Sequence, residues 1–364
     1  MELKILKTKN TEDKTTWEKL WQQLPEERRD VYFLPGYIGA YEENESKEGL
    51  CMAFVKEDAV LLYPFLKCKI ENTSFSEENH YDILSAYGYG GPVVNQAGEN
   101  KEFLSECWLI FSNWCKKEKI VGEFCRMHPL LDNKRWAPSE MNVVNNRKTV
   151  VLDLNTYPES VWKESYFRIH RNMIRRAKRE NFEYHRTKAV GQMGWFAASY
   201  DATQNILGAS DETRFKKNYF DSLASGLGEK VWLAVVEKNN ERVASVLVLE
   251  GEQFVHSHLM SYENDRSSKG ATNYIYHHIA LDAAERGKRY LHMGGGNSGN
   301  EDDALYKFKC SLSPDRREFY IGTRCHDSEI YNKLADSWEK LNGSLPKGYF
   351  LFYRKKNDKK EVNT

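Results

Sequence analysis

The sequence lacks a net charge, a long apolar run and paired cysteines. Lys plus Arg and Asp plus Glu each number 53 in 364 residues, so no overall field attracts polyanions and no DNA partner is expected. The longest apolar run, around 59–66, is too short to span a bilayer, so we expect peripheral membrane contact at most. The seven cysteines form no C-x-x-C motif, which argues against a disulfide framework or a zinc site. We expect a soluble cytoplasmic protein.

What the chain has is length and a high aromatic content of 13%, which together predict two domains with sizeable cores. Hydrophobic periodicity predicts the order β-α-α-β-β-β-α-β for the first half, with strands near 3–6, 50–55, 59–65, 81–84 and 120–127. The second half is predicted as β-α-α-β-β-β-α-β-α-β, with strands near 149–154, 231–236, 242–249, 253–260, 290–293 and 318–322. Tight turns are expected at Lys56-Glu57-Asp58 and Asn239-Asn240.

The repeated order favours two domains of one architecture, over 1–148 and 149–354. The predicted class is α/β (α+β), in which each domain is a mixed, mainly antiparallel sheet flanked by helices. A charged tail over 355–364 is expected to be disordered.

A glycine loop follows one of the predicted strands. The strand that ends at Met293 opens directly into Gly294, Gly295 and Gly296, where a backbone without side chains can approach a ligand closely. The alternative is a simple turn. Lys309 follows, and a partly buried lysine can stabilise an oxyanion or handle a proton, whereas an exposed one is only a surface charge.

A strongly basic helix is predicted over 166–179, with six basic residues and no acidic one. Arg168, Arg171, Arg175 and Arg179 share one face of it, and guanidinium groups suit phosphate or an RNA backbone. A solvated surface face is the alternative.

Two further segments favour ligand binding. The segment Lys269-Gly270-Ala271-Thr272 opens a helix, whose free N–H groups suit a pyrophosphate or a 3′-terminal nucleotide. It is otherwise an ordinary helix start. The loop around Tyr87 and Tyr89 either shapes a substrate groove or turns a corner.

Two pairs of polar side chains are placed by strand alternation. Arg126 and His128 are predicted to point to one side, toward a cleft between the domains, although a structural role fits each equally well. His256 and His258 share a face and are candidate general bases. A metal is not expected, because no carboxylate or third histidine stands at a recognised spacing from them.

In their order along the chain, these segments resemble the Fem family of peptidoglycan-bridge aminoacyltransferases within the GNAT acyltransferase superfamily. The segments are YDILSAYGYGGP, EFCRMHP, RIHRNMIRRAKR, KGATNYIYHHIALDAAERG, HMGGG and LYKFKCSLSPDRREFYIG. The resemblance implies two tandem GNAT-like domains, with transfer chemistry in the second and acceptor binding at their interface. It also implies that Lys309 serves at the transfer centre, and that Arg168 or Arg175 grips an acceptor phosphate.

Two departures from the family leave the acyl donor open. No long helical-hairpin arm interrupts the second half, and the stretch over 266–271 only loosely approximates the glycine-rich pyrophosphate loop of CoA-using members. We therefore expect an acyltransferase that uses aminoacyl-tRNA or acyl-CoA, binds no permanent cofactor, and acts on an amino group of a nucleotide-linked or lipid-linked cell-wall or surface-polysaccharide precursor. The alternatives are a CoA-dependent N-acetyltransferase of amino sugars or other soluble amines, and a non-catalytic protein that binds RNA or a precursor.

The predicted site residues fall into three groups. The catalytic candidates are Lys309 and His258. The substrate-binding candidates are Tyr87, Tyr89, Arg126, His128, Arg168, Arg175, Gly294, Gly295, Gly296, Asn297 and Tyr306. The donor-binding candidates are Lys269, Gly270, Ala271 and Thr272.

Overall fold

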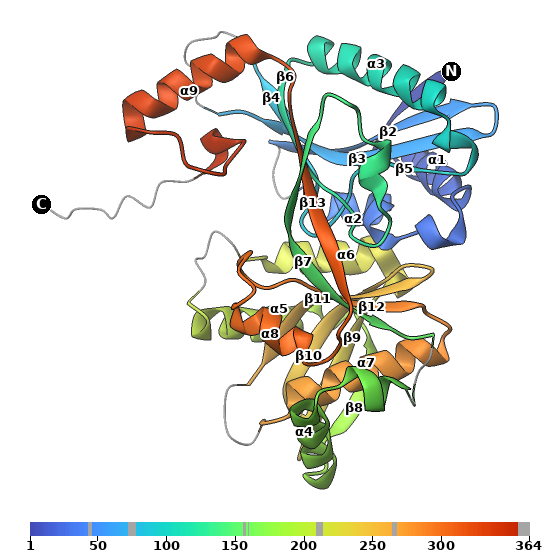
Figure 1. Cartoon of the computed structure of the whole chain (residues 1–364), viewed down its shortest axis with the longest axis vertical. Helices are drawn as coiled ribbons and strands as arrows, with labels where there is room; N and C mark the ends of the chain where they lie inside the picture. The colour runs from blue at the N-terminus through green and yellow to red at the C-terminus, as the bar shows by residue number, and fades with distance from the viewer. Residues whose placement is uncertain are drawn as a thin grey trace, which may run out of the picture.

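The computed structural model describes residues 1–42, 46–71, 78–155, 158, 160–208, 214–263 and 268–355. Its strands form one mixed thirteen-stranded sheet that runs through both halves of the chain (Figure 1). The strands are β1 (Glu2–Lys7), β2 (Lys47–Lys56), β3 (Ala59–Lys69), β4 (Tyr81–Leu84), β5 (Val93–Val94), β6 (Ile120–Arg126), β7 (Asn142–Asp153), β8 (Glu183–Lys188), β9 (Val231–Lys238), β10 (Glu241–Glu250), β11 (Phe254–Tyr262), β12 (Tyr290–Gly294) and β13 (Arg316–Cys325).

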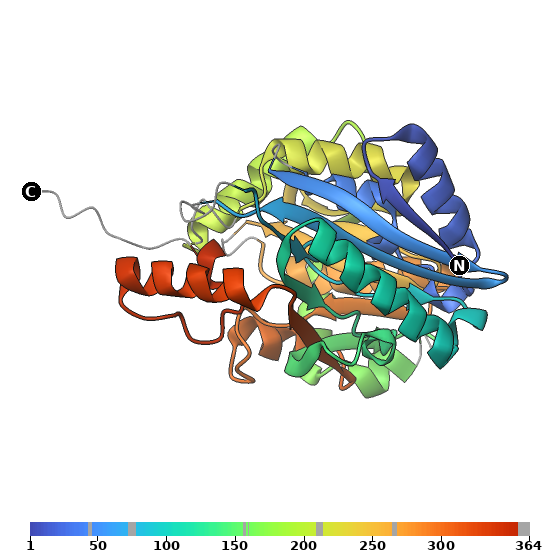
Figure 2. The ribbon, with the colours of Figure 1, turned by 90° about the horizontal axis from the view of Figure 1, so that it is seen from above.

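Helices cover this sheet on both sides. They are α1 (Thr11–Gln22), α2 (Pro35–Gly39), α3 (Lys101–Lys117), α4 (Arg168–Arg179), α5 (Met193–Ile206), α6 (Lys217–Leu227), α7 (Ala271–Glu285), α8 (Ala304–Cys310) and α9 (Ser328–Asn342). Seen from above, the strands of the first half run between α3 on one side and α1 on the other (Figure 2). The predicted fold class is therefore confirmed. No helix in the described parts of the chain is both long and apolar enough to cross a membrane.

The predicted order of elements holds for the first half except for the short strand β5, which was not predicted, and the turn between β2 and β3 lies within the predicted Lys56-Glu57-Asp58. The turn between β9 and β10 is also where the sequence places it. There Asn239 and Asn240 adopt φ of 53° and 63°, and Lys238 pairs with Glu241. These are the left-handed conformations that a tight hairpin requires and that asparagine tolerates.

Three elements of the second half are absent from the prediction, which has only two helices where α4, α5 and α6 lie and lacks β8 and α9. Strand β8 has the polar sequence EYHRTK, which shows no apolar alternation, and it forms because it pairs with the edge of β9. Helix α9 begins at Asp327, whose side chain caps it, and buries only Leu334 fully. The expected disordered tail lies outside the described residues, apart from Lys355.

The two halves share their central strands. The sheet order is β1-β2-β3-β4-β6-β13-β7-β12-β11-β10-β9-β8, so β13 pairs with β6 of the first half on one side and with β7 on the other. The expected boundary between residues 148 and 149 falls inside β7, which pairs with β13 and with β12. The chain therefore joins its halves through continuous backbone hydrogen bonding.

Strands β9 and β10 are apolar on both faces, because each face packs against helices. Leu233, Val235, Leu247 and Leu249 belong to the core that includes α5, α6 and the first half. Ala234, Val236, Val246 and Val248 belong to the second core, with α4 and α7. One apolar cluster thus extends from the first half into the second, which fixes the surfaces on which a site between them is built.

Candidate functional site

A cavity of about 1030 Å³ lies where two neighbouring strands separate. Strands β11 and β12 pair in parallel only between residues 254–256 and 290–292. Beyond that point both strands contribute side chains to the cavity, and the first half closes it with its loop around Tyr87 and with β6. Nine of the sequence-predicted residues line it: Tyr87, Tyr89, Arg126, His258, Gly294, Gly295, Gly296, Asn297 and Lys309.

Lys309 is almost fully buried at this cavity. Helix α8 presents it, and Asp303 starts that helix by accepting the backbone N–H of Tyr306 at 3.0 Å. The Lys309 ammonium donates to the carbonyl oxygen of Gly295 at 2.6 Å. Burial lowers the pKa of Lys309 to about 8, because a cation away from water loses its hydration. The group is therefore a cation near neutral pH that can lose its proton within the working range of an enzyme.

The glycine loop serves two purposes. Gly294 has φ of 73°, a left-handed conformation that favours glycine, and it lies beside Lys309, since a Cβ atom there would be 3.6 Å from Nζ. Gly296 instead makes room for the helix start, since its Cβ would lie 2.6 Å from Oδ1 of Asp303. The close backbone approach to a ligand stays a prediction for Gly294, whereas Gly296 is explained within the protein.

The tautomer of His258 is fixed by a chain of tyrosines. The Tyr37 hydroxyl donates to the backbone carbonyl of Tyr87, so its oxygen must accept from Tyr41 at 3.1 Å. Tyr41 in turn accepts from Tyr219 at 2.9 Å. Tyr219 then accepts from Nε2–H of His258 at 2.6 Å. Burial lowers the pKa of His258 to about 3, so the ring is neutral and its Nδ1 carries a lone pair.

The cavity lining is cationic. Arg126, Arg147 and Lys309 line it, and no Asp or Glu is among its described lining residues. Arg126 donates to the carbonyl of Ser85 at 3.4 Å, and Arg147 donates to Asn146 at 2.7 Å. Neither arginine forms an ion pair with a described carboxylate, so the cavity offers unneutralised guanidinium groups to an anionic ligand.

Asp30, His128 and His256 form a buried cluster behind the cavity. One carboxylate oxygen and two ring nitrogens lie within 4.8 Å of one another, and Nε2 of each histidine is 2.8 Å from Oδ2 of Asp30. Burial acts to raise the pKa of Asp30, but its interactions with His256 and His128, including a hydrogen bond from each, outweigh burial and hold that pKa well below its usual range.

This donor set favours hydrogen bonds over a metal ion. The backbone N–H of Leu130 donates to Nδ1 of His128 at 3.2 Å, so the neutral ring carries its proton on Nε2. Burial lowers the pKa of His128, which keeps the ring neutral. A histidine that binds a metal through Nε2 needs the opposite tautomer, with Nδ1–H donating to an acceptor.

The remaining sequence-predicted residues lie outside the cavity. The side chain of His128 is hydrogen-bonded to Asp30 and does not line the cavity beside Arg126. The alternation that predicted a shared side does not extend to His128, because β6 ends at Arg126. Tyr306 is buried, and Cζ of Arg316 lies over its ring, 5.8 Å from the ring centroid. The others without a place in the lining are Arg168, Arg175, Lys269, Gly270, Ala271 and Thr272.

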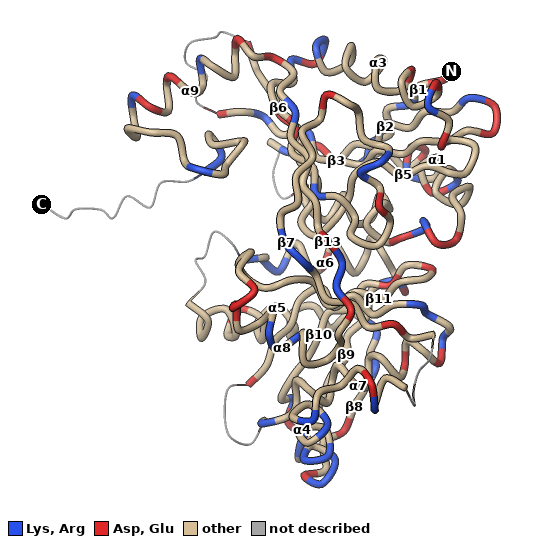
Figure 3. Tube along the Cα trace, in the orientation of Figure 1, with Lys and Arg blue, Asp and Glu red and all other residues tan. Residues whose placement is uncertain are grey.

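The basic helix is separate from the cavity as well. Helix α4 packs against α7 and forms the cationic end of the second half (Figure 3). Several of its cations have local partners: Arg171 donates to the carbonyl of Trp162 at 3.2 Å, Arg175 lies 5.5 Å from the ring of that residue, and Arg176 pairs with Glu180. Residues 266 and 267, the first two of the stretch that loosely approximates the glycine-rich pyrophosphate loop, lie outside the described residues.

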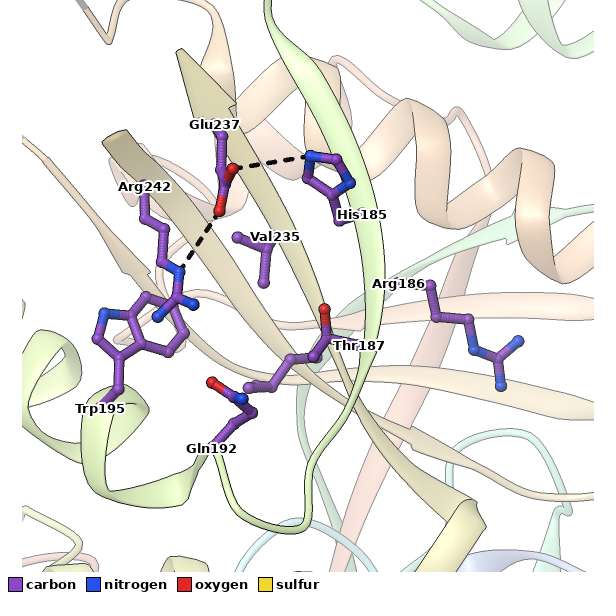
Figure 4. Close-up of a pocket in the computed structure, with 9 residues that line it drawn as sticks. His185, Arg186, Thr187, Gln192, Trp195, Val235, Glu237 and Arg242 are labelled. Carbon is purple, nitrogen blue, oxygen red and sulfur yellow. Dashed lines mark ion pairs between the residues drawn. The ribbon is translucent and has the colours of Figure 1, made fainter. Parts of the chain in front are cut away.

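A smaller cavity of about 350 Å³ lies between β8, β9 and α5 (Figure 4). Glu237 pairs there with Arg242 at 3.5 Å and with His185 at 3.7 Å, and Arg242 lies 4.1 Å from the ring of Trp195. Its arginines have carboxylate partners, since Arg186 pairs with Glu250 and Asp282 next to the cavity, in contrast to those of the larger cavity.

Sequence reasoning missed three residues of the larger site: Asp30, Arg147 and His292. Asp30 and His256 are 226 positions apart, and no local pattern connects them. Arg147 precedes a predicted strand, where a cation resembles any other surface charge. His292 was part of a motif that carried the resemblance, HMGGG, and alternation within that short strand was the one available signal.

Comparisons with known proteins agree with this geometry. Residues 166–308 match the acetyltransferase (GNAT) domain model. The structure of FemX is similar, with a TM-score of 0.68 and 12% identity over 92% of this chain and 99% of that chain. L-PGS from Bacillus licheniformis gives a TM-score of 0.53 and 17% identity over 85% of this chain and 92% of that one. No curated protein sequence matches the chain.

A tandem GNAT protein from the clavulanic acid biosynthesis pathway is also similar, with a TM-score of 0.52 and 7% identity over 90% of this chain and 99% of that chain. The resemblance to Fem-like GNAT proteins is thereby confirmed for the fold. Residues 166–308 are similar to the GNAT acetyltransferase domain, and the chain as a whole has a tandem GNAT-like fold similar to that of FemX.

Proposed function

We propose that the protein transfers an aminoacyl or acyl group to an amine of a phosphate-bearing cell-wall or surface-polysaccharide precursor. The cavity in the opening between β11 and β12 carries this proposal, because it combines a buried lysine, a neutral histidine and two arginines without carboxylate partners. Arg126 and Arg147 take the role of phosphate ligands that the sequence assigned to Arg168 and Arg175. The similarity to FemX and to L-PGS supports an aminoacyl donor.

The proposed mechanism is attack of the acceptor amine on an activated carbonyl carbon, which places negative charge on the carbonyl oxygen. The Lys309 ammonium has donors left after its bond to Gly295, and these stabilise the developing oxyanion. The lone pair on Nδ1 of His258 accepts an N–H from the amine and orients it for attack. Gly294 leaves the space in which the carbonyl meets Lys309.

A second candidate is a CoA-dependent N-acetyltransferase that acts on an amino sugar or another soluble amine. It is favoured by the domain model that matches residues 166–308, which describes an acetyltransferase. Calorimetric titration with CoA separates the two. Micromolar affinity supports a thioester donor, and the absence of heat favours aminoacyl-tRNA.

The proposed function is tested by incubating the protein with a UDP-linked muramoyl peptide that carries a free lysine amine. Acetyl-CoA and alanyl-tRNA serve as alternative donors, and mass spectrometry detects the product. We expect a mass increase of one acyl group with one of them. Lys309→Met should abolish the product, whereas Lys307→Met, which removes an exposed lysine paired with Asp302 at 2.8 Å, should not. No product with either donor would contradict the proposal for this acceptor class.

A further inference from the structure

A second histidine lies at the cavity, and the mechanism above does not use it. His292 in β12 lines the cavity, and its ring centroid is 5.0 Å from that of Tyr89. Only 2% of the residue is exposed, and its Nε2 has no hydrogen-bond partner among the described residues. A buried ring nitrogen without a partner is rare enough to require an explanation.

The hydrogen bonds behind His292 determine which of its nitrogens carries the proton. The ionised Asp30 only accepts, so His256 must donate to it from Nε2. With His256 neutral, its Nδ1 is an acceptor, and the bond of 3.3 Å between the two Nδ1 atoms requires His292 to donate. Neutral His292 then has its lone pair on Nε2. The one fully hydrogen-bonded arrangement of neutral rings therefore leaves a lone pair on Nε2 of a residue that lines the cavity.

His292 rests in this neutral form. Burial lowers its pKa far below the usual range, and the positive charge of Lys309 lowers it further. A ring without a proton is able to receive one.

We propose that His292 is the proton acceptor of the transfer reaction, taking a proton on Nε2 from the acceptor nitrogen and passing it to the leaving group. This inference rests on the acyl transfer proposed above. Asp30 and His256 act as positioning residues, because they fix the tautomer of His292 and place a carboxylate behind the cation that forms. The chain behind His258 ends instead in neutral tyrosines and a backbone carbonyl, which supply no charge for that purpose.

The step balances without a further reactant. The lone pair of the amine forms the C–N bond while the carbonyl electron pair moves to the oxygen near Lys309, and the nitrogen releases its proton to Nε2 of His292. The carbonyl then re-forms, and the C–O bond of an aminoacyl ester or the C–S bond of a thioester breaks. The departing oxygen or sulfur takes the proton, so the products are an amide and a free hydroxyl or thiol. His292 ends neutral, as it began.

The test has two arms. The first is a nitrogen-15 spectrum of the histidine rings in the wild-type protein, assigned by loss of the His292 signals in His292→Asn. We expect His292 to be protonated on Nδ1 and unprotonated on Nε2. A proton on Nε2 of resting His292, or a doubly protonated His256, would overturn the proposal even if no variant were active.

The second arm measures transfer to the UDP-linked muramoyl peptide. His292→Asn should lower kcat about a hundredfold or more with little change in KM, and added imidazole should restore part of the rate. The matched control is His326→Asn, which removes another buried histidine, one that contacts Glu123 at 2.8 Å outside the cavity, and should leave kcat unchanged. If the wild type transfers nothing, the proposed function fails and this inference with it. If the wild type is active and His292→Asn keeps its full kcat, only the role of His292 fails.

Discussion

Gly36 and Gly226 meet backbone to backbone where the two halves of the chain pack together. A Cβ atom at Gly36 would lie 2.0 Å from the carbonyl oxygen of Gly226, and one at Gly226 would lie 2.8 Å from the carbonyl oxygen of Gly36. The first glycine lies in α2 and the second in α6, so no other residue allows these helices to approach this closely. Their contact supports the aromatic chain that ends at His258, because Tyr37 and Tyr219 belong to the same two helices.

Replacing Gly226 with alanine is therefore expected to destabilise the protein, although alanine is the better helix former. Over-packing at this contact should lower the free energy of unfolding by about 1–3 kcal/mol, measured by urea denaturation. Gly194→Ala in α5 is the control, since its Cβ would meet only the flexible end of Lys217 at 3.5 Å. That variant should be stabilised by up to about 1 kcal/mol. Equal effects of the two substitutions would contradict the close helix contact.

Removing the buried cation at Lys309 should increase stability. Its pKa falls from 10.5 to about 8 on folding, so the unfolded chain binds more protons between these values and stability rises with pH across that window. The cost at neutral pH is roughly 3 kcal/mol. We expect Lys309→Met to raise the free energy of unfolding by up to about that amount at pH 7 and to differ little from wild type near pH 11. An increase that is the same at both pH values would show that charge burial is not its cause.

The rate of transfer should fall as pH rises through about 8 if Lys309 acts as a cation. Lys309→Arg keeps its charge throughout this range and should lose that alkaline limb, at a lower absolute rate because the guanidinium has a different shape. The measurement is kcat between pH 6 and pH 10. A wild-type kcat that rises through pH 8 would instead assign proton abstraction to the lysine.

Arg126 and Arg147 should determine the affinity for phosphate. Each charge-assisted hydrogen bond lost in Arg126→Gln or Arg147→Gln is worth about 1.5–3 kcal/mol, so we expect the Kd for the UDP-linked acceptor to rise roughly tenfold to a hundredfold. Calorimetric titration measures this directly. Arg135→Gln removes a surface arginine paired with Glu99 at 3.0 Å and should leave the Kd unchanged. Unaltered affinity in both cavity variants would place the phosphate elsewhere.

Replacement of the Asp30 carboxylate should destabilise the folded protein. Asp30→Asn removes the negative charge that accepts hydrogen bonds from two buried imidazoles, and we expect a decrease of about 1.5–3 kcal/mol in the free energy of unfolding at pH 7. Because the folded-state pKa of Asp30 lies below its usual range, its contribution is present above about pH 4 and is lost as pH falls further. The difference between wild type and variant should therefore shrink in acid. Asp132→Asn, at an exposed residue paired with Lys134, should change stability little at any pH.

The sequence predicts those parts of the molecule whose causes are local. The asparagines at 239 and 240 predict their hairpin because few residues tolerate two left-handed conformations in succession. The glycine loop and Lys309 are predicted together because a short strand, a turn and a helix follow one another in a few residues. The position of the Tyr87 loop at the cavity follows from the same kind of local pattern together with the family resemblance.

What could not be predicted depends on contacts between distant segments. The meeting of Asp30 with His256, and hence the tautomer of His292, exists only once the two halves are packed. Strand β8 is a strand because β9 offers it an edge, not because of its own sequence. The choice of Arg126 and Arg147 over the more basic helix α4 depends on where the cavity opens, which no charge pattern reveals.

The position of β13 has a consequence for how the protein is made. Residues 316–325 lie between β6 and β7, which are complete by residue 153. During synthesis, the first half therefore leaves the ribosome with the edge of β6 unpaired, and the 162 residues between β7 and β13 must follow before its partner strand emerges. Such an open edge invites pairing with other chains. A nascent chain stalled before residue 316 should consequently depend on chaperones for solubility, and native structure should appear in a single late event, not one half at a time.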